Sequence, residues 1–480
     1  MKELAHRALN QAQLLGASYA DIRIVLRRFE TISVHDGHVS GLSNDESNGF
    51  GIRVLFDGAW GFASSSRIEP AEIDRIAALA VEIAKASRSS NRGRIELGPP
   101  IAHVGSYRTP ILVNPFEIPI ERKLDILMQA DERMRSVPGI SITDSSLGAQ
   151  REWKLFASTE GSLIEQELFE TGCGIEATAV GHGDVQKRSY PNSFGRHQAK
   201  MGFELVEEMD LPGNAVRIAE EAVQLLTAPV CPSGKTTVIL DGPQMAIQIH
   251  ESIGHALELD RIFGMEASYA GTSFVHPGML HTFQYGSPIV EVTADATAQG
   301  GLGTFGFDDE GVPAQKVPLI RKGRLENVLS SRETAAQLGL SSNGTMLADG
   351  WNRIPLIRMT NINLEPGEWT LDGLIHDTED GLLLATNKSW SIDDKRLNFQ
   401  FATEVAWEIK GGKKGRMFKN PTYTGITPQF WAGCDGICDR DHWRIWGIPN
   451  CGKGQPPQTA HVGHGAAPAR FRNVEVGVIG

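Results

Sequence analysis

The stretch Thr236–Asp260, TTVILDGPQMAIQIHESIGHALELD, joins a short apolar run to a helical pattern that carries two histidines and a glutamate. The run VIL before an Asp-Gly pair predicts a short buried strand, and Pro243 is typical of the first turn of a helix. Apolar residues then recur at spacings of 3, 4 and 4, which places one stripe of the helix against a core: Ala246, Ile249, Ile253 and Leu257. The stretch therefore predicts a strand followed by a half-buried helix.

The chain on either side of this stretch has two different patterns. Before it, Asp-Gly pairs at 36–37 and 57–58 indicate β-hairpins, and we expect helices over 2–15, from Pro70, over 120–136 and over 214–228. Beyond about Gly264, strands and turns dominate, including a basic hairpin turn at 410–416. The sequence predicts an α+β fold with an α/β N-terminal region and a mixed sheet in residues 1–228, with a candidate break near 90–118. Residues 229–480 are predicted to form a β-rich C-terminal domain that carries the helix with the two histidines; the linker PVCPSGK begins it.

Composition excludes several classes of partner. The chain has 480 residues, 41% hydrophobic and 22% charged, with a mean hydropathy of −0.20, as in ordinary globular proteins. Its formal charge of −12 argues against nucleic acid, which requires clustered cations. No run approaches the roughly 18 apolar residues of a membrane span. The charged start of the chain is unlike a signal peptide, and five cysteines form no disulfide framework, so we expect a cytoplasmic protein.

His250 and His255 lie five positions apart, one more than in the familiar H-E-x-x-H zinc motif. At about 100° per residue, a regular helix would point the two side chains about 140° apart, too far to share one ion. A π-bulge would absorb the extra residue, and Gly254 lowers the cost of such a distortion. The zinc interpretation therefore predicts an irregular helix. The alternative is one partly buried and one exposed histidine without a metal, although Glu251 is suited to deprotonate a metal-activated water.

A third ligand has to come from elsewhere, because catalytic zinc commonly has three protein ligands. The candidates are near the C-terminal end of the sequence: Cys434, Cys438, Cys451, His461 and His464. They could form a separate structural zinc cluster, or one thiolate could complete the site of the helix. The context NCGKGQ favours Cys451, because Lys453 could stabilise its thiolate. Cys173 and Cys231 are expected to be buried thiols without chemistry.

Several of these motifs together resemble the TldD/PmbA family of metallopeptidases, historically labelled modulators of DNA gyrase. The motifs are the H-E-x-x-x-H helix, FGFDDEGVPAQKVPLIRKGRLENVL, GRMFKNPTYTG and NCGKGQPPQTAHVGHGAAPARFRNVEVG, with a similar first domain. The resemblance implies a TldD-type catalytic subunit in which His250, His255 and Cys451 bind zinc and Glu251 is the general base. It also implies unfolded or small peptides as substrates, and a cavity enclosed by a homodimer or by a heterodimer with a PmbA-type paralogue. The segment around 388–394 and the pair Cys434 and Cys438 depart from the family pattern.

Two other functions remain open from the sequence. One is a zinc hydrolase of a non-peptide amide. The other is a non-catalytic binding subunit whose metal has a fourth protein ligand, such as Cys438 or His464. The loop 300–311 could supply oxyanion-binding amides or could be a plain tight turn. We expect His276 and His281 to be solvated, and Asp308, Asp309 and Glu310 to form a solvated turn or to bind a peptide amine.

Overall fold

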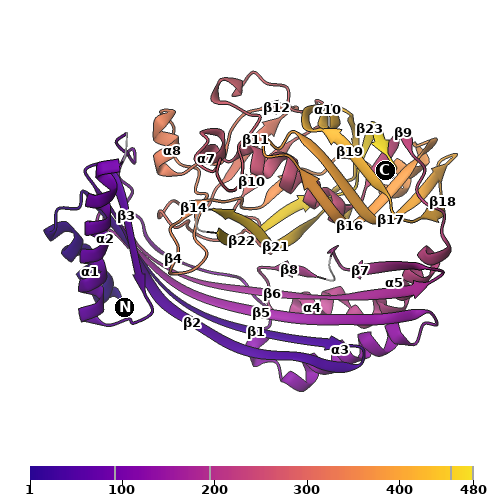
Figure 1. Ribbon diagram of the computed structural model, residues 1–480, viewed down its shortest axis with the longest axis horizontal. Helices are drawn as coiled ribbons and strands as arrows, with labels where there is room; N and C mark the ends of the chain where they lie inside the picture. The colour runs from indigo at the N-terminus through magenta and orange to yellow at the C-terminus, as the bar shows by residue number, and fades with distance from the viewer. Residues whose placement is uncertain (91–92, 194–195, 455–456, 478–480) are drawn as a thin grey trace.

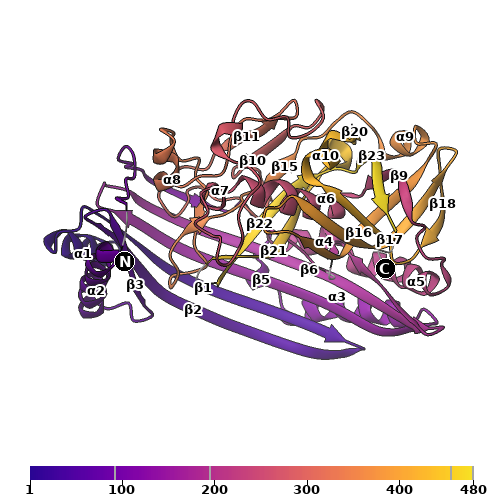
Figure 2. The ribbon, with the colours of Figure 1, turned by 45° about the horizontal axis from the view of Figure 1, so that its top comes forward.

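A long curved sheet forms the base of the molecule, and the C-terminal half of the chain lies over one face of it (Figures 1 and 2). The computed structural model describes residues 1–90, 93–193, 196–454 and 457–477. The sheet order is β3-β2-β1-β5-β6-β4, and β7 and β8 both pair with β6. The strands are β1 (Tyr19–His35), β2 (His38–Phe56), β3 (Ala59–Ser65), β4 (Val104–Arg108), β5 (Ile140–Ser158), β6 (Leu163–Gly181), β7 (Asp184–Tyr190) and β8 (His197–Ala199).

The two predicted hairpins are confirmed. β1 and β2 pair antiparallel up to His35 and His38, and β2 and β3 up to Phe56 and Ala59. Both residues of each connecting Asp-Gly pair have positive φ, between 46° and 78°. A two-residue turn of this kind matches the twist of the flanking strands. Among the described strands of this sheet, only β4 runs parallel to its neighbour, so the sheet is mixed as predicted.

Helices bury the two ends of this sheet in separate cores. One core joins α1 and α2 to β1, β2, β3 and β5, and another joins α3, α4 and α5 to the opposite ends of β1, β5 and β6. The predicted helices are confirmed within a few residues. The helices are α1 (Lys2–Leu14), α2 (Pro70–Ser90), α3 (Ile120–Arg135), α4 (Glu204–Met209) and α5 (Leu211–Thr227), with a short 3₁₀ turn, η1 (Pro115–Glu117). No described helix is long and apolar enough to cross a membrane.

A second large sheet organises the C-terminal half. Its order is β16-β9-β23-β19-β17-β18, with β20 paired to β23, and β16 also pairs with β17. The strands of this half are β9 (Gly234–Leu240), β10 (Val292–Asp295), β11 (Lys316–Arg321), β12 (Arg324–Leu325), β13 (Met346–Leu347), β14 (Leu356–Ile357), β15 (Ile362–Leu364), β16 (Asp380–Ile392), β17 (Asn398–Lys410), β18 (Lys413–Phe418), β19 (Thr422–Ile426), β20 (Cys434–Ile437), β21 (Arg444–Gly454), β22 (Pro457–Ala466) and β23 (Ala469–Val476). Short helices connect them: α6 (Gly242–Ile249), η3 (His250–Gly254), η4 (His255–Leu257), α7 (Leu259–Ile262), η5 (Pro277–Met279), α8 (Arg332–Gln337), α9 (Leu371–His376), α10 (Thr427–Ala432) and η6 (Arg440–His442). The α+β class and the β-rich C-terminal half are confirmed; the boundary at 228/229 stays a prediction.

The expectation of a solvated acidic turn at 308–310 is wrong. All three carboxylates are buried, at 1–2% exposure. Asp309 accepts a hydrogen bond from Lys154 at 2.7 Å, and Glu310 lies 3.3 Å from Arg53 of β2. These ion pairs join the C-terminal half to the long sheet, because a buried charge is stable only beside an opposite charge.

Candidate metal centre

The helix that carries both histidines changes its winding where they occur. It starts after β9 as α6, where the Asp241 side chain accepts a hydrogen bond from the Gln244 amide at 2.8 Å. From His250 to Gly254 the winding is that of a π-helix (η3), and a 3₁₀ turn (η4) follows from His255. The predicted irregular helix is confirmed. The wide turn brings the two imidazole rings to 4.8 Å between centroids, whereas a regular helix would point them apart.

Side chains from neighbouring elements support the wide turn. The Tyr285 hydroxyl donates to the Ser252 carbonyl, and the Trp431 indole donates to the Ser252 hydroxyl at 2.9 Å. Gly254 has ordinary helical dihedrals, but a Cβ there would lie 2.0 Å from the Met359 sulfur. Glycine is therefore needed here because the backbone passes too close to Met359 for any side chain. The sequence alone instead predicts glycine for its conformational freedom.

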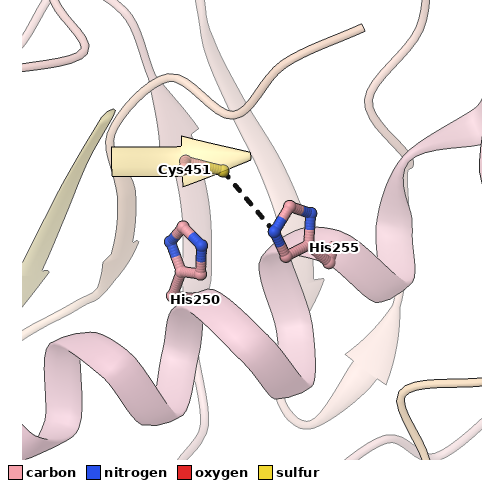
Figure 3. A group of neighbouring side chains, drawn as sticks. All are labelled: His250, His255 and Cys451. Carbon is pink, nitrogen blue, oxygen red and sulfur yellow. Dashed lines mark hydrogen bonds between the residues drawn. The ribbon is translucent and has the colours of Figure 1, made fainter. Parts of the chain in front are cut away.

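Cys451 reaches the histidines from β21, which forms a two-stranded hairpin with β22. Its Sγ atom lies 3.5 Å from His255 Nε2, and one ligand atom from each of His250, His255 and Cys451 lies within 4.8 Å of the others (Figure 3). All three side chains are buried. The structure therefore brings together the three residues that the sequence analysis selected.

The geometry of these atoms suits a tetrahedral zinc ion. With Zn–N near 2.05 Å and Zn–S near 2.3 Å, tetrahedral angles place nitrogen and sulfur about 3.6 Å apart. The observed separation of 3.5 Å between His255 Nε2 and Cys451 Sγ agrees with this value. Among the described residues, no fourth histidine, cysteine or carboxylate joins the group.

Hydrogen bonds at the opposite ring nitrogens orient both imidazoles. His464 Nδ1 lies 3.3 Å from the Ile362 carbonyl, which can only accept, so His464 Nε2 is left as an acceptor for His250 Nδ1 at 2.8 Å. His255 Nδ1 donates to Glu258 at 2.9 Å. Each of the two imidazoles therefore keeps its Nε2 lone pair for a metal, as in many histidine-ligated sites.

Behind His255, buried charges fix Glu258. Glu258 accepts a hydrogen bond from Arg261 at 2.8 Å and lies 3.4 Å from Lys453 Nζ. Burial alone would raise the pKa of Glu258, but Lys453, His255 and Arg261 outweigh it and hold the pKa well below its usual range. Glu258 is thus a permanent anion that accepts the His255 proton.

The three candidate ligands have pKa values that favour their metal-binding protonation states, neutral imidazole and thiolate. Burial lowers the pKa of both His250 and His255 to about 4, so both are neutral at pH 7. Burial alone would raise the pKa of the Cys451 thiol. Arg358 and His255 outweigh burial, so this pKa lies below its usual value. The sequence pointed to Lys453 as the stabilising cation; Lys453 instead contacts Asp260 at 2.8 Å, and Arg358 acts on the thiol.

Glu251 lines a cavity of about 470 Å³ together with the three candidate ligands. Its carboxylate accepts a hydrogen bond from Arg396 Nη1 at 2.5 Å. Arg396 comes from the loop between β16 and β17 and lines the same cavity. The sequence carries no signal for Arg396, because the hydrogen bond spans 145 residues.

The remaining candidates lie elsewhere. Cys434 is buried in the same large core as Cys451 but does not join the ligand group, and Cys438 is buried in a separate core, where burial raises its pKa to about 12. His461 contacts Glu170 of the long sheet at 2.5 Å. His276 and His281 are exposed, as expected. In the loop 300–311, the Gly303 amide donates to Asn361 at 2.9 Å, and no described residue of this loop lines the metal cavity.

Models of the three domains of the PmbA/TldA metallopeptidases match the chain. Domain 1 matches residues 20–84, the central domain 113–228 and the C-terminal domain 233–477. The C-terminal match alone spans more than half of the chain. The chain belongs to the PmbA/TldD metallopeptidase family. It is therefore a peptide-bond hydrolase of the metal-dependent kind.

Individual members of the family are similar over most of their length. A metalloprotease of Methanocaldococcus jannaschii is 31% identical over 410 residues, 85% of this chain and 86% of that protein. A zinc metalloprotease TldD homolog of Saccharolobus solfataricus is 23% identical over 98% of both chains. The crystal structure of TldE from Thermococcus kodakarensis has the same fold, with a TM-score of 0.79 and 16% identity, covering 99% of this chain and 100% of that one.

Proposed function

We propose that this metallopeptidase is a zinc enzyme that hydrolyses unfolded or small peptides. The proposal rests on one observation: the Nε2 and Sγ donors of His250, His255 and Cys451 converge in a cavity that Glu251 also lines. A zinc ion held by these three residues would polarise the peptide carbonyl and lower the pKa of a water molecule. One coordination position would stay open for that water, which favours catalysis over a closed structural site.

The chain's own residues would then move the proton. Glu251 would accept a proton from the attacking water and deliver it to the nitrogen of the leaving amine. His464 and Glu258 would hold His250 and His255 in the tautomers that present Nε2. Arg358 would keep Cys451 in the thiolate form.

Assembly and location form part of the same proposal. We propose a dimer, either of identical chains or with a PmbA-type paralogue, and the likeness to TldE supports the second arrangement. We also propose a cytoplasmic location, because all five cysteines are free thiols.

One purification of the wild type and Glu251→Gln tests the proposal. We expect both to hold one zinc ion per chain, and the variant to cleave unstructured peptides about 10²- to 10⁴-fold more slowly. Glu368→Gln, at an exposed position, is the matched control and should cleave normally. Equal cleavage by wild type and Glu251→Gln would refute the role of Glu251, and loss of zinc from the wild type would refute the site.

A further inference from the structure

The loop between β16 and β17 holds Arg396 in an unusual backbone conformation. Arg396 has φ of +62°, a region that glycine adopts readily and that costs other residues free energy. The loop fixes this conformation: the Arg396 amide donates to the Asp393 carbonyl at 2.9 Å, and Thr427 Oγ1 donates to the Arg396 carbonyl at 2.8 Å. The loop therefore places an arginine side chain beside Glu251 in a backbone conformation that glycine would adopt more readily.

The guanidinium of Arg396 has more donors than its neighbours use. It carries five N–H groups. Glu251 accepts from Nη1 at 2.5 Å, and the Ala270 carbonyl accepts from Nη2 at a long 3.4 Å. Nε is buried and has no partner among the described residues. The group therefore has capacity for a further acceptor beside the general base.

The cavity around Arg396 favours an anion with an apolar neighbour. Apart from the three candidate ligands, its described charged lining residues are Arg196, Arg396 and Glu251. Two arginines face one carboxylate and the Cys451 thiolate, so a bound zinc ion would make the net charge of this lining positive. The apolar part of the lining includes Ile247, Trp390 and Ile448.

We propose that Arg396 binds the α-carboxylate of a peptide substrate, so that the enzyme removes residues from the C-terminal end. This inference rests on the proposed peptidase function. Arg396 contacts Glu251 and lines the same cavity as the three candidate ligands, so an anion bound to Arg396 lies beside the general base. A carboxylate one residue beyond the reacting carbonyl, a span of about 3.3–3.8 Å, would suit this position. Every peptide with a free C-terminus carries such an anion, because its α-carboxylate belongs to the residue directly after the last peptide bond.

The reaction is then hydrolysis of the last peptide bond. Water oxygen bonds to the carbonyl carbon, the C–N bond breaks, and the released amino acid takes the proton from Glu251. The substrate carboxylate would accept from the N–H groups of Arg396 that Glu251 and Ala270 leave unused, and the Glu251 oxygen that does not contact Arg396 would accept the water proton. Ile247, Trp390 and Ile448 would contact the side chain of the released residue.

The test uses an unstructured pentapeptide that ends in phenylalanine, with either a free carboxylate or an amide. We expect wild-type kcat/KM to be at least about tenfold higher for the acid, as for a lost charge-assisted hydrogen bond, with release of phenylalanine seen by mass spectrometry. Arg396→Gln should abolish this acid-to-amide ratio. Lys395→Gln removes the same charge from an exposed side chain of the same loop and should keep the ratio.

A binding measurement gives a second readout without turnover. Zinc-loaded Glu251→Gln should bind the acid at least about tenfold more tightly than the amide, and the double variant with Arg396→Gln should bind both alike. This comparison is independent of any effect of Arg396 on the general base.

The outcomes separate the inference from the proposed function. If the wild type cleaves acid and amide equally, or if Arg396→Gln slows both equally, the inference is overturned while the peptidase stands. An amidated peptide with a penultimate aspartate that is cleaved as fast as the acid would assign Arg396 to acidic side chains and also overturn it. If the wild type cleaves no peptide, the proposed function itself fails.

Discussion

His250 Nδ1 lies 2.8 Å from His464 Nε2, and this contact determines which nitrogen of His250 faces the candidate metal site. Both rings are buried, and the Ile362 carbonyl fixes the proton on the far side of His464. A chain of hydrogen bonds, here called the relay, thus links the Ile362 carbonyl to His464 and His464 to His250, whose Nε2 faces the candidate metal position. His464, a candidate fourth ligand by its place in the sequence, instead accepts a hydrogen bond from the candidate ligand His250.

Removal of this partner should weaken metal binding. We expect His464→Leu to lower zinc affinity by about 10- to 100-fold, because His250 loses the acceptor that fixes its tautomer. His464→Gln retains an acceptor and should recover part of the affinity. Competition with a chromophoric chelator measures both. His461→Leu, on the same strand but directed at Glu170, is the control and should bind zinc normally; tight binding by His464→Leu would contradict the relay.

Cys451 should be the most reactive thiol of the metal-free protein. Its pKa lies below the usual value, whereas burial raises the pKa of Cys434 and Cys438. We expect iodoacetamide at pH 7.5 to modify Cys451 first and zinc to protect it. Arg358→Gln should slow the modification and move its pH midpoint upward. Peptide mapping by mass spectrometry measures the order, and faster labelling of another cysteine would count against it.

Gly254 should tolerate no side chain. In Gly254→Ala the new Cβ would meet the Met359 sulfur at 2.0 Å, so the wide turn or Met359 must move. We expect a loss of about 1–3 kcal/mol in the free energy of unfolding, together with reduced zinc content. Met359→Ala in the same chain should restore part of both. Gly148→Ala, whose Cβ would meet only the Glu30 carbonyl at 3.6 Å, is the control for urea unfolding.

His197 should make stability depend on pH. Burial, and then the charge of Arg444, lower its pKa from 6.5 to about 3. Between these values the unfolded chain binds the proton and the folded chain does not. The contribution is therefore fully present above pH 6.5 and is lost as the pH falls toward 3. From pH 7 to 5 this single group should cost about 2 kcal/mol.

Urea unfolding of metal-free protein at the two pH values tests this expectation. His197→Phe should lose less stability between pH 7 and 5 than the wild type, even if it is less stable at both. His442→Phe, at an exposed position, should lose as much as the wild type. Identical losses in wild type and His197→Phe would show that His197 does not titrate in this way.

Local patterns in the sequence predicted local structure well. The Asp-Gly hairpins follow from the tolerance of those residues for positive φ, and the irregular helix follows from the angular separation of His250 and His255. The length of β1, β2, β5 and β6, each 17 or 19 residues, was not predicted. The local alternation of apolar and polar side chains does not show how far a strand continues to pair with its neighbour.

Long-range charge pairing explains the main errors. Asp309 and Glu310 have the composition of a solvated turn, yet their partners Lys154 and Arg53 lie 155 and 257 residues away along the chain. Arg396 was missed for the same reason, since its loop meets Glu251 only in three dimensions. Cys451 was predicted as a ligand because the glycines on both sides of Lys453 and the family resemblance both pointed to it.

The elements of the candidate metal site are separated along the chain, so the site is assembled late in synthesis. β9, which leads into the histidine helix, lies between β16 and β23, and Cys451 precedes β23 by fewer than 20 residues. A nascent chain that has emerged as far as residue 440 has both histidines and Glu251 but neither the thiol nor the strand that closes the sheet beside β9. Under the proposed ligand set, such a partial chain lacks one metal ligand and has no complete candidate site.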